Sequence, residues 1–246
     1  MVPQIALTML GGFDLVSHGE RIVLPPSAER VVAYVALHQG PATRPNVAGT
    51  LWLDVPEERA MANLRSALWR LRRPGVEIVD ATGDHLSISP KLAVDVRELS
   101  VAARYWLDGD AAADVSQLHR LAYSRDLLDD WYEDWVLVER EHFRQLRLQA
   151  LERLSHELAA TGQFGRAVDT ALAAVASEPL RESAHRALIS VHLAQGNRGE
   201  AIRQYCIYRQ LMRDELDLEP SNQMDALIGP VPSMAAERVM RAMTGR

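Results

Sequence analysis

Residues 54–73 hold the feature that most constrains the fold, an amphipathic segment whose apolar and cationic residues separate at helical spacing. The apolar residues recur every three or four positions, which predicts one buried stripe along a helix. The stripe consists of Met61, Leu64, Leu68 and Leu71. The opposite face comprises Arg59, Asn63, Ser66, Arg70 and Arg73, with Arg65, Trp69 and Arg72 on its flanks. The pattern predicts a helix that docks on a core and presents arginines outward.

The ends of this helix carry signals of their own. Asp54 and Glu57 fit an Asp-x-x-Glu capping box, and Pro56 suits a first turn. Pro74-Gly75 predicts the end of the helix, since proline cannot extend it and glycine favours a terminating turn.

Strand signals follow the helix at once. Val76 to Val79 is rich in apolar, β-branched residues, residues 81–84 are typical of a turn, and two further short strand patterns continue to Val94. A basic helix face taken alone is equally consistent with a solvated surface. Together with the hairpin it predicts a winged helix-turn-helix.

The residues before the basic helix complete this domain. Residues 4–24 alternate in hydrophobicity and predict a small antiparallel sheet. Ser27 is a candidate N-cap for a helix through about Gln39, and a shorter helix is expected from Pro45 to Trp52. We therefore expect an α+β winged helix-turn-helix domain over residues 1–95.

From Leu99 onward helical patterns replace strand patterns. They occupy about 96–107, 111–123, 132–160, 164–177, 181–195, 198–215 and 221–228. The frames Gly162–Ala167 and Gly196–Ala201 are nearly superposable, with two glycines and an alanine at matching positions, and lie thirty-four residues apart, the period of tetratricopeptide repeats. The sequence predicts an all-α, tetratricopeptide-like domain over 96–229 and a C-terminal tail over 230–246.

The charge distribution bears on possible partners. The formal net charge is −6, but residues 1–95 contain nine Lys and Arg against ten Asp and Glu, so most of the acidity lies later in the chain. Five arginines cluster within 59–73, and an anionic partner responds to this local field more than to the total.

No segment has the pattern of a signal peptide or a membrane span, so we expect a cytoplasmic, nucleoid-associated protein that does not bind membranes. The single cysteine, Cys206, is expected to be a small core residue.

Motifs for catalysis or metal binding are missing from the sequence. Its eight histidines show no His-x-x-x-His or His-Glu-x-x-His spacing, and there is no Gly-x-Ser-x-Gly elbow or Gly-x-x-x-x-Gly-Lys-Ser/Thr phosphate loop. The carboxylates within 126–134 are expected to cap a helix start, where negative charge favours the exposed amides. The sequence predicts no enzyme, no metal site and no cofactor.

The larger aromatic residues are expected to act mainly in packing. Trp52 and Trp69 lie close to the basic helix, where an indole can contact a sugar or a thymine methyl group but more often fills a core. Packing between helical layers is also the expectation for Trp106, Trp131, Tyr132 and Trp135.

Several short motifs occur in an order and spacing typical of one family. They are Leu10-Gly11-Gly12-Phe13, Leu51-Trp52, Asn63-Leu64-Arg65, Leu71-Arg72-Arg73, and Leu127 to Val136 leading into Glu139-Arg140-Glu141. On these residues the chain resembles the SARP family of actinobacterial antibiotic-regulatory activators over about residues 4–228. The resemblance implies an OmpR-like winged helix followed by a bacterial transcriptional activation domain.

The resemblance also implies a DNA-binding surface. In that family the third helix enters the major groove and the wing contacts the adjacent minor groove or backbone, and the planar fork of arginine suits guanine. The residues expected to contact DNA are Arg59, Asn63, Ser66, Arg70 and Arg73 of the third helix, and Arg44, Thr82 and His85 of the second helix and wing. For the last three, a solvated loop residue is the alternative. The acidic loop before Arg59 departs from the pattern because it would repel phosphates.

The expected function is sequence-specific activation of a secondary-metabolite (antibiotic) gene cluster. Paired protomers or a homodimer would bind promoter direct repeats of double-stranded DNA and help recruit RNA polymerase holoenzyme. A winged helix at the N-terminus leaves no room for the phosphorelay receiver that often precedes OmpR-like domains, and nucleotide switching is not expected. The alternative is a tetratricopeptide-like scaffold for protein interactions whose winged helix does not read DNA.

Overall fold

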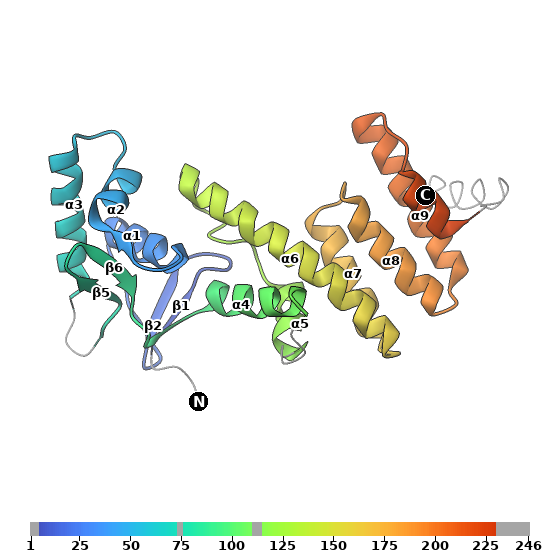
Figure 1. Cartoon of the computed structure of the whole chain (residues 1–246), viewed down its shortest axis with the longest axis horizontal. Coiled ribbons are helices and arrows are strands. Elements are labelled where there is room, and N and C mark those ends of the chain that lie inside the picture. The colour runs from blue at the N-terminus through green and yellow to red at the C-terminus, as the bar shows by residue number, and fades with distance from the viewer. Residues whose placement is uncertain (1–4, 73–75, 110–114, 230–246) are drawn as a thin grey trace. The chain divides into compact units, whose positions relative to one another are not determined.

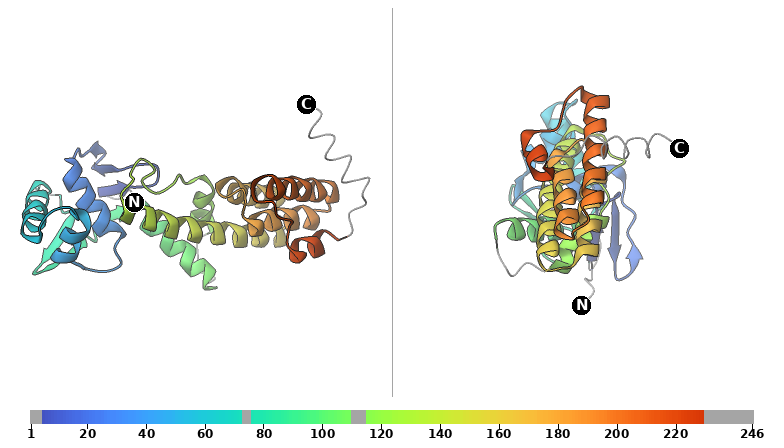
Figure 2. Two further views of the ribbon diagram at one scale, coloured as in Figure 1. Left: turned by 90° about the horizontal axis from the view of Figure 1, so that it is seen from above. Right: turned by 90° about the vertical axis from the view of Figure 1, so that its right-hand side faces the viewer.

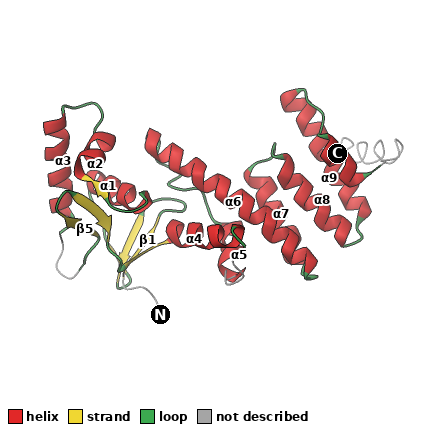
Figure 3. Cartoon of the chain, viewed as in Figure 1, coloured by secondary structure: helices red, strands yellow, loops and turns green. Residues whose placement is uncertain are grey.

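The structure is a computed structural model that describes residues 5–72, 76–109 and 115–229. It contains two compact units: the N-terminal unit, Met1–Val101 with Ser124–Arg144, and the helical unit, Ala102–Tyr123 with Gln145–Arg246. All described strands belong to the N-terminal unit (Figure 3). Each unit is discontinuous in sequence, so the consecutive domains expected over 1–95 and 96–229 stay a prediction, and the tail over 230–246 lies outside the described residues.

The first sheet of the N-terminal unit has four strands in the order β3-β2-β1-β7. Its strands are β1 (Ile5–Thr8), β2 (Asp14–Ser17), β3 (Glu20–Arg21) and β7 (Leu92–Val94). The antiparallel pairing of β1 with β2 and of β2 with β3 confirms the predicted sheet, but β7 adds a parallel partner to β1. The carboxylate of Asp95, just after β7, accepts hydrogen bonds from the backbone N–H groups of Met9 and Leu10, each at 3.0 Å. These hydrogen bonds join the residue after β7 to the two residues after β1.

Three helices and a second sheet form the winged helix-turn-helix (Figure 1). The helices are α1 (Pro26–Leu37), α2 (Arg44–Leu51) and α3 (Glu57–Arg70). The sheet has the order β4-β6-β5 and consists of β4 (Ala42–Thr43), β5 (Val79–Thr82) and β6 (His85–Ile88). Helix α1 packs against both α3 and β6, and fully buried residues such as Val31, Leu64 and Leu86 form the core between them. The predicted fold of this part is confirmed.

The predicted caps of α1 and α3 are wrong. The N-cap residues are Pro25 and Pro56, neither helix start has a side-chain cap hydrogen bond, and Ser27 lies inside the first turn of α1. Proline fixes φ near the value needed to enter a helix, so the chain can turn into α3 without the Asp54 and Glu57 capping box.

The hairpin is shifted relative to its prediction. Strand β5 begins at Val79, which pairs with Ile88, and it continues to Thr82, which pairs with His85. Only Gly83 and Asp84 remain in the turn. Gly83 adopts a φ of 57° there, as the first position of a tight two-residue hairpin turn requires. The register is therefore set by the tight turn, and the apolar residues before Val79 precede the strand.

The seven predicted helices of the later chain are confirmed. They are α4 (Asp95–Leu107), α5 (Val115–Tyr123), α6 (Asp134–Ala160), α7 (Phe164–Ser177), α8 (Glu182–Ala194), α9 (Arg198–Leu216) and α10 (Asn222–Ile228). Helices α7, α8 and α9 lie side by side in succession (Figures 1 and 2). Across the described residues, no helix has the length and apolar character needed to span a membrane.

The predicted repeat has the same backbone geometry in both copies. Gly162 and Gly196 adopt φ values of 76° and 81°, and the N-cap residues after them, Gln163 and Asn197, have φ of −83° and −82°. The N–H of each N-cap residue donates a 2.8 Å hydrogen bond back to the preceding helix. The equivalent turns confirm the tetratricopeptide-like arrangement.

Candidate nucleic-acid interface

Helix α3 is rotated relative to the predicted stripe. Its buried residues are Ala60, Leu64 and Ala67, followed by Leu71 at the C-cap, whereas Met61 and Leu68 are half-buried. The buried alanines face the contacts with α1 and α2, because small side chains allow close approach of packed helices. This rotation decides which arginines point outward.

The predicted polar residues form one flank of α3. Arg59, Ser66 and Arg70 are exposed, and Asn63 is half-buried. The Arg70 Nη1–H donates to Ser27 Oγ at 3.3 Å, so this flank lies toward the start of α1. Arg73 lies outside the described residues.

A second row of exposed residues lies opposite the buried stripe. Arg65 and Trp69, four positions apart, align along α3, and exposed Arg72 follows just after its C-cap residue, Leu71. The Trp69 side chain is 71% exposed, so the expectation that it fills a core is wrong. These three residues were expected only on the flanks of the polar face.

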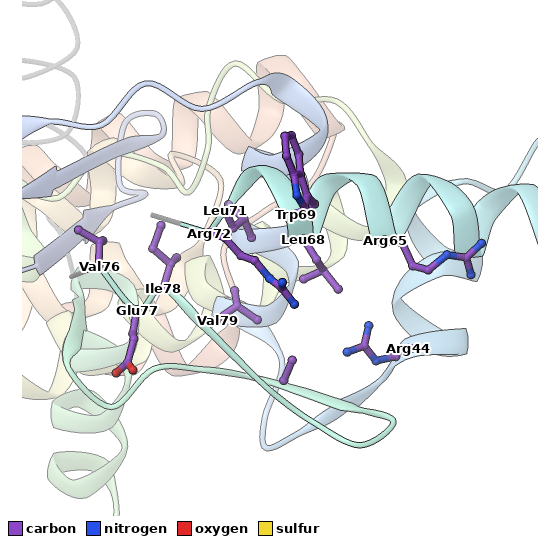
Figure 4. Close-up of a pocket in the computed structure, with 11 residues that line it drawn as sticks. Arg44, Arg65, Leu68, Trp69, Leu71, Arg72, Val76, Glu77, Ile78 and Val79 are labelled. Carbon is purple, nitrogen blue, oxygen red and sulfur yellow. The ribbon is translucent and has the colours of Figure 1, made fainter. Parts of the chain in front are cut away.

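A hollow of about 760 Å³ lies between α3 and the β5–β6 hairpin (Figure 4). Its lining includes Arg44 of α2, Arg65, Leu68, Trp69 and Arg72 of the α3 region, and Val79 of β5. Arg44 and Arg72 point toward the hollow, whereas Arg65 extends along α3 away from it (Figure 4). The helix and the hairpin thus share one cationic surface.

Arg44 is held in place by the turn of the hairpin. Its Nε–H donates to the carbonyl oxygen of Gly83 at 3.1 Å, and its backbone N–H donates to that of Asp84 at 2.8 Å. Thr82 and His85 pair directly beside this turn and are both exposed. All three wing-region candidates therefore gather at one end of the hairpin.

The hollow keeps its positive charge. Within the described residues, Arg65 and Arg72 form no ion pair, and the one carboxylate in the lining, Glu77, is bonded to Lys91 at 2.7 Å. That hydrogen bond lowers the pKa of Glu77 and raises the pKa of Lys91, so the pair stays ionised. Anionic groups are favoured at this surface.

The remaining aromatic and acidic candidates have structural contacts. Trp52 is half-buried, with the Arg30 guanidinium 6.0 Å from its ring centroid, and Trp131 stacks on Phe13 at 6.1 Å. Trp106 and Trp135 are also half-buried, but Tyr132 is 78% exposed, so the packing expectation is wrong for Tyr132. Two of the expected capping carboxylates form ion pairs instead, Asp129 with Arg125 at 2.7 Å and Glu133 with Arg30 at 2.9 Å.

Cys206 is buried in α9, as predicted, and burial raises the pKa of its thiol. Over the part of the chain that the structure describes, no three or more His, Cys, Asp or Glu side chains gather in a way that could hold a metal ion.

Comparison with protein families identifies the relatives of this chain. Residues 77–231 match the bacterial transcriptional activator domain model, which is more than half of the sequence. The chain belongs to the bacterial transcriptional activator domain family. The family is one of transcription regulators and is not an enzyme family.

Two curated relatives are regulatory proteins named AfsR. The protein of Streptomyces coelicolor is 29% identical over 212 residues, covering 79% of this chain and 21% of the relative. That of Streptomyces griseus is 25% identical over 241 residues, covering 94% and 23%. The chain spans about a fifth of the length of these relatives, and the match confirms the predicted resemblance to SARP-type regulators.

A solved structure shares the fold. Mycobacterium tuberculosis EmbR, in complex with a low affinity phosphopeptide, matches with a TM-score of 0.74 at 18% identity, covering 98% of this chain and 69% of EmbR. The likeness supports the predicted succession of a winged helix and an all-α domain.

Proposed function

We propose that this chain binds double-stranded DNA through α3 and the β5–β6 hairpin and activates transcription from the promoters that it binds. The observation that carries the proposal is the shared surface of Arg44, Arg65 and Arg72, which no described acid neutralises. DNA presents a dense row of phosphates, and arginine is well suited to contact both phosphates and guanine.

The elements fit the geometry of B-DNA. The major groove admits an α-helix, and one sugar-phosphate strand separates it from the adjacent minor groove. With α3 in the major groove and the hairpin at the next groove, that strand would lie along the hollow between them. Arg44 and Arg72, which point toward the hollow, then contact phosphates, whereas Arg65 can reach base edges.

The residues predicted from sequence belong to the periphery of this surface. We assign Arg59, Asn63, Ser66 and Arg70 to the flank of α3 beside α1, where contacts to the opposite backbone of the groove are expected. We assign exposed Thr82 and His85, beside the hairpin turn, to contacts at the minor groove. The acidic residues before Arg59 limit the contribution of that end of α3.

The finer points of the function belong to the proposal. Control of a secondary-metabolite gene cluster is proposed from the resemblance to the SARP family, and similarity to two regulatory proteins supports a regulatory role. The activator domain supports a role in activating transcription, and paired protomers on direct repeats that help RNA polymerase holoenzyme to engage are part of the proposal.

Selection of duplexes from a random library with the complete chain tests the proposal. We expect enrichment of a shared sequence, whose binding an Arg65→Ala, Arg72→Ala double variant weakens strongly. Exposed Arg120 of α5 and Arg203 of α9, of which only Arg203 forms an ion pair among the described residues (with Glu200 at 3.8 Å), provide a double-alanine control, which should bind normally. Failure of the wild-type chain to retain any duplex at low salt would contradict DNA binding and favour the scaffold alternative.

A further inference from the structure

Trp69 is an unusual residue for the outer face of α3. Its side chain is 71% exposed, while the other large apolar side chains of the helix, Met61, Leu64 and Leu68, are buried or half-buried. Among the described residues, no ring stacks on the indole and no cation lies over it. Large indoles are mostly buried in folded proteins, so an exposed one on a candidate binding face indicates a partner surface.

Trp69 borders the hollow, but its indole points away from the hairpin side, where the phosphate contacts are assigned. Figure 4 shows Trp69 projecting from α3 away from the hairpin, whereas Leu68 and Arg72 point toward the hollow. Trp69 shares its ridge with Arg65, four residues earlier and one helical turn away. If the hollow holds the backbone, this ridge is the part of α3 that enters the groove.

The chemistry of the indole restricts what it can recognise there. Its nitrogen is a donor only, and the remainder of its surface is apolar. The base edges in the major groove are polar except at thymine, which presents a C5-methyl group. Apolar contact with that methyl group is the interaction that an exposed tryptophan can make selectively.

We infer that Trp69 packs against the methyl group of a thymine and so determines part of the sequence specificity. This inference rests on the proposed DNA-binding function. The separation of four positions between Arg65 and Trp69 corresponds to a rise of about 6 Å along the helix, and base pairs are about 3.4 Å apart. A thymine and the base contacted by Arg65 should therefore lie about two base pairs apart.

Uracil lacks the methyl group of thymine but pairs identically, which provides a direct test. The enriched duplex is prepared once with thymidine and once with deoxyuridine, and the complete chain is titrated with each. Wild-type affinity should fall about fourfold for each contacted methyl group, since burying one such group contributes about 0.8 kcal/mol.

Variants assign that effect to the indole. Trp69→Ala should bind the two duplexes equally, at an affinity no higher than that of the wild type for the uracil duplex, and Trp69→Phe should retain part of the difference. Tyr132→Ala removes an aromatic side chain of similar exposure elsewhere in the N-terminal unit, and it should keep the full wild-type ratio. Thermal melting verifies that each variant folds, as their exposure predicts.

Three results would overturn the inference and leave DNA binding intact: equal wild-type affinity for both duplexes, an unchanged ratio in Trp69→Ala, or an enriched sequence without a shared thymine. Absence of binding to any duplex would instead remove the proposed function, and the inference with it.

Discussion

The sequence does not distinguish the arginines that the fold engages, in ion pairs or at backbone carbonyls, from those that it leaves without a partner in the described residues. Some arginines donate hydrogen bonds to backbone carbonyls at the ends of helices. Arg97 donates to the carbonyl oxygen of His38 at 2.8 Å, and Arg153 donates to that of Leu107 at 2.7 Å. A cation there satisfies groups that the helix leaves unpaired. Arg65 and Arg72 have no such partner within the described residues. Tertiary contact, rather than residue type, marks the arginines available for a ligand.

Arg65 and Arg59 provide a matched comparison on one helix. Both are exposed and without an ion pair in the described residues, but Arg59 follows Glu57 and Glu58, whereas Arg65 borders the hollow. We expect Arg65→Ala to weaken binding of the enriched duplex by about 1–3 kcal/mol, the range of a bidentate base contact. Arg59→Ala should cost much less. Fluorescence anisotropy titrations measure both, and equal losses would argue against the assigned orientation of α3.

His185 makes the stability of the helical unit depend on pH. It is 1% exposed, its Nε2–H donates to the Pro179 carbonyl oxygen at 2.8 Å, and its Nδ1 accepts from the Gln204 amide at 2.8 Å. The tautomer follows from the carbonyl, which can only accept. Burial lowers the pKa of His185 below 6.5.

The unfolded chain therefore binds a proton at a higher pH than the folded chain. The contribution of neutral His185 to the free energy of unfolding should be fully present above pH 6.5. It should decline as the pH falls toward the lowered pKa, by at most about 1.4 kcal/mol per pH unit. Tyr208 and Glu182, paired with Arg186, also lie near this histidine. Thermal melts from pH 7.5 to 5.5 should show a steeper decline for wild type than for His185→Gln, and identical slopes would contradict this assignment.

At the scale of elements, the turns determine where the candidate DNA-binding residues and the repeat helices lie, more than the N-caps of the helices do. The shift of β5 places Thr82 and His85 beside Gly83-Asp84, and the same turn holds Arg44. In the helical unit, the glycine turns before α7 and α9 repeat one geometry. Local turn chemistry therefore positions both the candidate interface and the repeats.

Two neighbouring glycines should respond to alanine in opposite directions. Gly196 has a φ of 81°, Gly199 lies within the first turn of α9, and a Cβ atom would meet nothing within 4 Å at either position. Gly196→Ala should lower the free energy of unfolding by about 1–2 kcal/mol, because an L-residue is strained at positive φ. Gly199→Ala should raise it by up to about 1 kcal/mol through helix propensity. Urea unfolding compares them, and a loss in both variants would indicate unfavourable packing.

Charge over the complete chain is segregated. The net charge of −6 coexists with a cationic surface at α3 and the hairpin, and the acidic run 54–58 lies at the opposite end of the helix from Arg70 and Arg72. Such a distribution favours orientation of the protein on an anionic partner in spite of its total charge.

DNA binding should accordingly depend strongly on salt. Four to six phosphate contacts give a slope of roughly −4 to −5 in a plot of log affinity against log salt concentration. Arg44→Ala and Arg72→Ala should each reduce the magnitude of the slope by about 0.9, while Trp69→Ala should leave it unchanged. Titrations at four salt concentrations suffice, and a slope near zero would contradict the electrostatic contribution.

Local sequence was sufficient to predict the type and order of most elements. The periodicity of apolar residues located α3 and the helices after Leu99, and the spacing of Gly162 and Gly196 predicted the repeated turns, because both patterns depend on neighbours along the chain.

Contacts between distant segments decided the rest. The parallel pairing of β7 with β1, the rotation of α3 onto Ala60 and Ala67, and the exposure of Trp69 each depend on how remote elements pack. Periodicity predicts that α3 has an apolar face but not which residues lie at the centre of that face. Close packing against α1 and α2 selects one rotation of the helix about its axis. That rotation placed Arg65 and Trp69 on the outer ridge of α3, where the periodicity alone had placed Arg59, Asn63 and Ser66.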